Sequence, residues 1–310
     1  MSFSYGNNNA GASVNGNFIP VLWSSKLLKR FYMTTILSSI VNQDYAGEIS
    51  SHGAKVVIRR PPVVSINQYV PSGIAGHTPL EYQELTTEEL ELIIDQAFSF
   101  SFKVDDVLKA QADVGIMNAA MGDAGENMKI AVETQVLGNI FSGAATQVGS
   151  SASPVSVSKD DVIDMIVEAG TRLDEKNIGE SGRFLAIPPW MGAKIKTSDL
   201  KDASLSGDAK SPLRNGLIGN VDRFSIYVSN NLPVTDATGK LKGSEGFDPA
   251  TASTKVLAGT KAFASYANQV TKTENVKLEK QFGEAIRGLH VHGSKVVQPD
   301  AGVCIHAKAA

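Results

Sequence analysis

Hydrophobic and polar positions alternate along this chain with two different periods. Residues 21–41 carry apolar residues at helical spacing, and residues 107–141 repeat them every three, four or seven positions, so both segments are predicted helices. Phe98, Phe100 and Phe102 alternate with polar residues in strict period two, which predicts a strand with one buried face. The two glycines within Gly122–Asn127 are expected to kink or split the second helix.

Between these two helices the pattern predicts a long antiparallel hairpin. Residues 54–60 and 63–70 are strand-like, and Pro61 with Pro62 separates them. A further strand-like stretch begins at Glu89. Residues 47–97 are therefore expected to extend away from the body as a hairpin loop. An isolated hairpin is not stable in water, so this loop needs support from elsewhere.

The second half of the chain mixes short helices with strands. Helices are predicted at 159–176 and 190–195, and strands at 183–187, 217–228, 255–266, 270–281 and 285–297. The last strand, 302–307, is expected to return antiparallel to 285–297 after the QPDAG turn at 298–302. The predicted fold class is α+β with long projections.

Composition excludes several classes of function. The 29 basic and 32 acidic residues give a formal charge of -3, the wrong sign for tight binding of nucleic acid, so only weak and non-specific contact with DNA is expected. No uncharged apolar run is long enough to cross a membrane. No phosphate-binding, dinucleotide or metalloprotease motif occurs, so no cofactor and no enzymatic activity are predicted. The GESGR stretch, Gly179–Arg183, only superficially resembles a nucleophile motif, because its second glycine is misplaced.

The C-terminal strands contain the only plausible ligands for a metal. The weak candidates are His290, His292, Cys304 and His306. In the predicted register Val296 faces Cys304 and Ser294 faces His306, which leaves the other two histidines too far along the hairpin for a compact tetrahedral site. The sequence therefore favours ordinary strand histidines and a buried cysteine over a metal site.

Charged residues mark the base of the predicted loop. The candidate subunit contacts are Arg59, Arg60, Glu88, Glu89 and Glu91. The arginines could form a phosphate or carboxylate clamp, or simply be solvated at a strand end. An intersubunit ion pair is preferred, because this end of the loop has no chain of its own to rest on and the acidic run has the matching sign.

Several segments, taken in order, resemble the major capsid proteins of tailed bacteriophages, which have the Hong Kong 97 fold. They are IPVLWSSKLLKRF at 19–31, VNQDYAGEI at 41–49, KVVIRRPP at 55–62, FSFSFKVDDVLKAQAD at 98–113, GRFLAIPPWM at 182–191, GLIGNVDRFSIYVSNNLP at 216–233 and HVHGSKVVQPDAGVCIHA at 290–307. No single motif is specific, but their order and spacing are. Together they extend over most of the chain.

The resemblance implies a fold of four parts. Residues 1–46 would be an N-terminal arm and 47–97 an extended loop. Residues 98–183 with 268–310 would form a peripheral domain built on a long spine helix. Residues 184–267 would form an axial domain, and the last strands would return to the peripheral sheet.

The resemblance also implies a function. The chain would assemble into hexamers and pentamers of an icosahedral head around double-stranded DNA. Its partners would be a separate scaffold protein, a portal and a possible cement protein, and it would assemble in the host cytoplasm to become part of the virion. Two alternatives are an encapsulin-type nanocompartment shell and a small metal-dependent enzyme or binding module.

Overall fold

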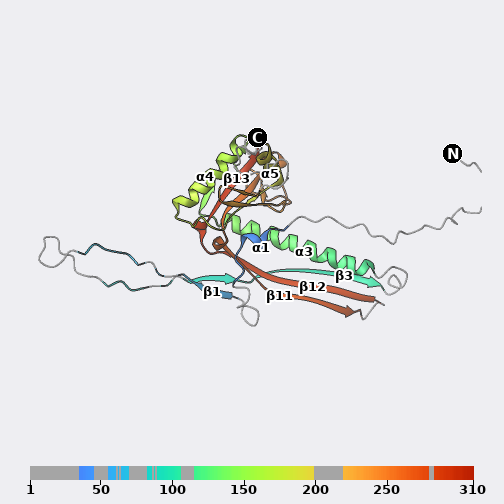
Figure 1. Cartoon of the computed structure of the whole chain (residues 1–310). Coiled ribbons are helices and arrows are strands. Elements are labelled where there is room, and N and C mark those ends of the chain that lie inside the picture. The colour runs from blue at the N-terminus through green and yellow to red at the C-terminus, as the bar shows by residue number, and fades with distance from the viewer. Residues whose placement is uncertain are drawn as a thin grey trace, which may run out of the picture.

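The computed structural model describes residues 35–44, 55–60, 62, 64–69, 82–85, 87, 89–105, 115–198, 219–278 and 283–310. These residues form three β-sheets with helices packed against them (Figure 1). The predicted arm up to residue 34, the first turns of the predicted helix at 107–114, and Glu88 lie outside the described residues. Among the described helices, none is both long and apolar enough to cross a membrane.

The largest sheet has eight strands and lies at the end of the molecule that carries the C-terminus (Figure 1). Its main path is β4-β13-β10-β6-β8-β7, with β5 beside β13 and β9 beside β10. The strands are β4 (Thr146–Val148), β5 (Val155–Val157), β6 (Arg183–Ile187), β7 (Asn220–Val221), β8 (Phe224–Val228), β9 (Val234–Thr235), β10 (Ser253–Thr260) and β13 (Gly302–Ala309). The predicted strand 183–187 is confirmed without any change in its bounds.

Helices cover both faces of this sheet. In β6, Leu185 and Ile187 face α4 (Asp161–Glu175) and α5 (Pro189–Thr197), whereas Phe184 faces the cluster formed by α1 (Leu37–Ile40) and the end of α3 (Gly115–Ser142). Every residue of β6 is buried, which explains why its sequence is apolar at consecutive positions rather than at alternate ones. Ser158 caps α4, because its hydroxyl accepts the backbone N–H of Asp161 at 3.2 Å.

A second sheet of three long strands lies beside α3 (Figure 1). Its order is β11 (Ala264–Lys277), β12 (Gly283–Val296) and β3 (Gln96–Asp105). The period-two prediction holds, because the alternate Phe98, Phe100 and Phe102 are half-buried while the residues between them are exposed. The expected split of the helix at Gly122–Asn127 is wrong, since α3 runs unbroken from Gly115 to Ser142. Packing of the flanking turns outweighs the helix-propensity cost of about 1 kcal/mol per glycine.

The last strand does not fold back on its predecessor, so the predicted hairpin is wrong. β13 pairs with β10, where Cys304 lies opposite Leu257 and His306 opposite Lys255. The QPDAG stretch is a bend, formed by the short helix η5 (Pro299–Ala301), and not a reversal. It lies beside a second short helix, η4 (Lys261–Phe263). At these two bends the antiparallel pair β10 and β13 of the eight-stranded sheet continues as the antiparallel pair β11 and β12 of the three-stranded sheet.

This crossing gives two elements partners that the predicted domain division did not give them. Strand β13 was assigned with residues 268–310 to the peripheral sheet, but it is a central strand of the eight-stranded sheet. Helix α4, assigned to 98–183, packs against β13 and β10 of that same sheet. Six of the eight residues of β13 are buried, which only a central strand with both faces covered allows.

A third sheet, which has two strands, forms the base of the predicted extended loop. β1 (Lys55–Arg59) pairs antiparallel with β2 (Glu89–Ile93). Beyond it, residues 64–69 and 82–85 form two limbs that stretch away from the body (Figure 1). Neither limb forms a strand, so the strand predicted at 63–70 is wrong for its described residues. The described residues give these limbs little support, which is consistent with the low intrinsic stability of a lone hairpin.

Candidate functional site

The charged residues predicted as subunit contacts lie on the two-stranded sheet. Arg59 lies directly opposite Glu89, with 3.8 Å between Nε and Oε1. Further along the sheet, Lys55 pairs diagonally with Glu91 at 2.5 Å. All four side chains are largely exposed. Exposed pairs of this kind contribute about 1 kcal/mol or less, so these charges remain available to a further partner.

Arg60 differs from its neighbour, because it points back into the molecule. Its guanidinium donates a hydrogen bond to the carbonyl oxygen of Val297, at the end of the three-stranded sheet. Ile58, Leu92, Ile94 and Ala267 form a small buried cluster at the same place. The base of the loop is therefore fixed to the three-stranded sheet by both an apolar and a polar contact.

The two limbs beyond this base expose large apolar side chains. The fractional exposure of these side chains runs from 55% to 97%, and they are Val64, Ile66, Tyr69, Tyr82 and Leu85. The limbs are joined to each other, because Ser65 N–H donates to the side-chain oxygen of Gln83 at 3.2 Å. A large exposed apolar surface on a soluble protein usually marks an interaction site. Sequence reasoning concentrated on the charges and did not single out these side chains.

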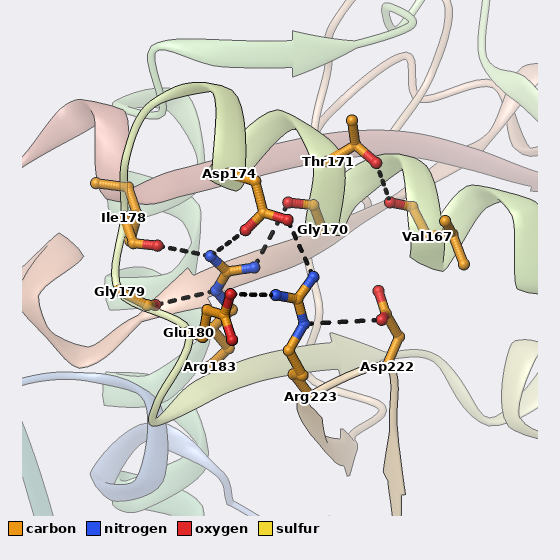
Figure 2. A network of polar contacts seen from close by, with 10 residues as sticks. All are labelled: Val167, Gly170, Thr171, Asp174, Ile178, Gly179, Glu180, Arg183, Asp222 and Arg223. Atoms are coloured by element: carbon orange, nitrogen blue, oxygen red, sulfur yellow. Dashed lines mark hydrogen bonds and ion pairs between the residues drawn. The ribbon is translucent and has the colours of Figure 1, made fainter.

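A polar network lies where α4 ends, and Figure 2 shows its members. The side chain of Arg183 is fully buried and donates to Asp174 at 2.6 Å and to the carbonyl of Ile178 at 2.6 Å. It also donates to the carbonyl of Gly179 at 3.0 Å. The GESGR stretch is therefore a loop held in place by its own arginine.

Arg223 completes this network from the neighbouring hairpin (Figure 2). It binds the second oxygen of Asp174 at 3.0 Å and Glu180 at 2.9 Å. Asp222 and Arg223 both have positive φ, 44° and 64°, as the two-residue turn between β7 and β8 requires. The two arginines hold the pKa of Asp174 below its usual range, mainly through the hydrogen bond from Arg183.

The four weak metal candidates do not come together. His290 and His292 lie on β12 of the three-stranded sheet, whereas Cys304 and His306 lie on β13 of the eight-stranded sheet. Within the part of the chain that the structure describes, no group of three or more His, Cys, Asp or Glu residues could hold a metal ion. Burial raises the pKa of the Cys304 thiol to about 11, so it is not a reactive thiolate at neutral pH.

His292 is buried among aromatic rings. Its ring lies 5.6 Å from that of Phe98 and 5.5 Å from that of His290, and Tyr266 lies 6.0 Å away. Neither ring nitrogen of His292 has a hydrogen-bond partner among the described residues. Burial, with a smaller contribution from His290, lowers the pKa of His292 to about 4. The group is therefore neutral at pH 7.

A cavity of about 470 Å³ lies between α3 and the three-stranded sheet. Its lining is mostly apolar and includes Leu37, Phe100, Met121, Met128, Val132 and Tyr266. The buried carboxylate of Glu133 lines it too, and it accepts the backbone N–H of Ile36 at 2.9 Å and the amide of Asn231 at 3.2 Å. Burial raises the pKa of Glu133.

Comparison with known proteins shows what kind of molecule carries these surfaces. The sequence model of a family described as phage capsid protein matches residues 93–305, more than two thirds of the 310 residues. This chain belongs to the phage capsid protein family. A search of curated protein sequences finds no match.

Solved structures agree on the fold of this capsid protein. A chain from Mycobacterium phage Che8 is 27% identical, with a TM-score of 0.77 over 94% of this chain and 97% of that one. The capsid of the cyanophage P-SCSP1u superposes with a TM-score of 0.75 at 19% identity over the whole of both chains. A chain from Gordonia phage Cozz gives a TM-score of 0.64 at 13% identity, over 100% of this chain and 99% of that one.

Membership of the phage capsid protein family decides between the functions that the sequence predicts. The chain is a structural protein of an icosahedral phage capsid, with the Hong Kong 97-like fold, and is located in the virion shell. It is a major capsid protein and not an enzyme. The comparisons give no support to the nanocompartment alternative.

Proposed function

We propose that the extended loop of this capsid protein lies across a neighbouring copy, and that such contacts close the subunits into hexamers and pentamers. The observation that carries this proposal is the row of five large, exposed apolar side chains on the two limbs. Burying one such side chain is worth about 2 kcal/mol, so a neighbour that covers them contributes substantially to shell stability. Head-to-tail contacts with near-rotational geometry close into rings.

The charged base of the loop is proposed as the second part of the contact. Arg59, Arg60, Glu88, Glu89 and Glu91 are the candidate residues, and Glu88 lies outside the described residues. Arg59 and Glu89 are exposed, and each retains hydrogen-bonding capacity beyond its partner in the chain. Arg60 is proposed to act indirectly, by fixing the direction in which the loop leaves the body.

The four-part organisation stays a proposal with amended bounds. The N-terminal arm at 1–46 falls mostly on undescribed residues, and 47–97 remains the extended loop. The three-stranded sheet with α3 is proposed as the peripheral unit. The eight-stranded sheet, now with α4 and β13, is proposed as the axial unit.

Other partners follow from the family resemblance alone. We propose assembly in the host cytoplasm with a separate scaffold protein and a portal, with a cement protein as a further candidate partner. Contact with packaged DNA is proposed to be weak and non-specific, because the net charge is -3. Tight retention of duplex DNA by the purified protein in filter binding at about 0.15 M salt would contradict this.

Replacement of the limb side chains tests the main proposal. The double variant Ile66→Ser with Tyr82→Ser should leave the fold of the subunit unchanged, because both side chains are almost fully exposed at 97% and 96%. It should abolish or strongly reduce particle formation, as seen by electron microscopy and light scattering. Val167→Ser on α4, another exposed apolar position, is the control. Normal particle yield from the double variant would refute the proposal.

A further inference from the structure

The cavity beside α3 reaches the point where the described chain begins. Thr35, Leu37 and Ser38 line one part of it, and the residues of α3 from Met121 to Glu133 line another. Phe100 of β3 and Tyr266 and Thr273 of β11 form the opposite wall. The cavity is a groove along α3, whose apolar wall has no cover among the described residues.

The segment that directly precedes Thr35 is rich in apolar side chains. Residues 21–34 contain Val21, Leu22, Trp23, Leu27, Leu28, Phe31, Tyr32 and Met33. Their helical spacing predicts an amphipathic helix, whose apolar stripe must be buried against something. The apolar groove and an apolar segment of the sequence thus meet at residue 35.

The lengths of segment and groove agree. The lining residues Met121 and Glu133 are twelve positions apart on α3, so the groove extends about 18 Å at 1.5 Å per residue. The backbone N–H of Ile36 binds Glu133, which places the start of the described chain at one end of the groove. A helix over residues 23–34 has the same length of about 18 Å and would reach the end at Met121.

The charges also favour this occupant. Residues 21–34 carry Lys26, Lys29 and Arg30 and no acidic residue. Apart from the buried and hydrogen-bonded Glu133, helix α3 carries Asp123 and Glu126 against a single base, Lys129, which lines the groove and pairs with Glu126. Opposite net charges favour the approach of the segment to this helix.

We propose that residues 21–34 lie along α3 of the same chain and fill this cavity with apolar side chains such as Leu28 and Phe31. The groove is then a seat for the N-terminal segment and closes the exposed side of the three-stranded sheet. This inference goes beyond the proposed assembly function, because it concerns a contact within one subunit.

Cross-linking tests the contact directly. A short bismaleimide should link the cysteines of a Leu28→Cys, Met128→Cys double variant, because Met128 lines the cavity. Leu28→Cys with Asn127→Cys is the matched control, since Asn127 is the exposed neighbour outside the lining. The only native cysteine, Cys304, is buried and should not react.

The position of the cross-linked band decides between occupants. A product that migrates as a single chain, formed at position 128 and much less at 127, supports the proposal. A product that migrates as a dimer would assign the groove to a second copy and overturn the proposal. Equal cross-linking at both positions, or none, would overturn it too. These results do not depend on particle yield, so they are distinguishable from failure of the assembly proposal.

A pair of glycine variants gives an independent readout. A Cβ added at Gly122 or at Gly125 meets no atom within 4 Å, so both positions of α3 have room for a side chain. Only Gly125 lines the cavity. Gly125→Leu should therefore displace the segment and speed tryptic cleavage at Lys26, Lys29 and Arg30 several-fold, whereas Gly122→Leu should not. Equal cleavage rates in both variants and the parent would contradict the proposal.

Discussion

A buried arginine determines the local structure where α4 meets β6. Arg183 has no exposed side-chain surface, and it satisfies two loop carbonyls as well as Asp174. No apolar residue can replace these bonds, because each carbonyl would keep its need for a donor. The same residue belongs to a stretch that superficially resembles a catalytic motif, so its role became clear only from its contacts.

Arg183→Met should therefore destabilise the subunit by about 3 kcal/mol, because it leaves buried acceptors unsatisfied. Urea denaturation of the unassembled subunit measures the change in the free energy of unfolding. Arg172→Met is the control, since Arg172 is exposed and pairs only with Glu168 on the surface of α4. Equal losses in the two variants would show that burial of Arg183 is unimportant.

His292 is expected to make the stability of the subunit depend on pH. Burial lowers the pKa of His292 from 6.5 to about 4. The neighbouring His290 adds to this shift and Asp95 opposes it. The hydroxyl of Tyr266 forms a hydrogen bond with His290. Between pH 6.5 and about 4 the unfolded chain binds the extra proton, so stability falls as the pH falls through this window. His292→Phe should flatten this part of the profile and leave stability at pH 8 little changed. A parallel loss of stability in parent and variant over the window would exclude His292 as the cause.

At the scale of elements, the attachment of the loop depends on close backbone contact. Gly293 of β12 lies against the carbonyl of Ile93 at the end of β2, and a Cβ there would fall far inside van der Waals distance of that backbone oxygen. The two strands can approach only because residue 293 has no side chain. This contact, together with the cluster around Leu92, sets where the loop leaves the body.

Gly293→Ala should shift the loop and reduce particle assembly while the eight-stranded sheet stays folded. Electron microscopy measures assembly, and circular dichroism measures the retained fold. Gly288→Ala is the comparison, because there the obstacle is the far end of the Phe100 side chain, which can turn, and not a backbone atom. A variant at 293 that assembles as well as the one at 288 would contradict this role of Gly293.

At the scale of the whole molecule, the charged residues at the base of the loop bind either each other or residues of a neighbouring subunit. The exchange variant Arg59→Glu with Glu89→Arg restores the pair within the chain, because the two residues lie directly opposite each other. It reverses the charges that a neighbour would meet. We expect a folded subunit with impaired assembly, measured by light scattering, and normal assembly would limit this pair to a role inside one chain.

The sequence alone determined the elements whose signal is local. Strand β6, helix α4 with its cap at Ser158, and the alternating face of β3 follow from periodicity and capping, which depend on neighbouring residues. The tertiary structure decided what pairs with what. It placed β13 beside β10 and left α3 unbroken through two glycines. It also put His290 and His292 on a different sheet from Cys304 and His306. Strand partners and buried networks depend on contacts between residues far apart in the chain, and a local pattern carries no information about which distant surface will cover it.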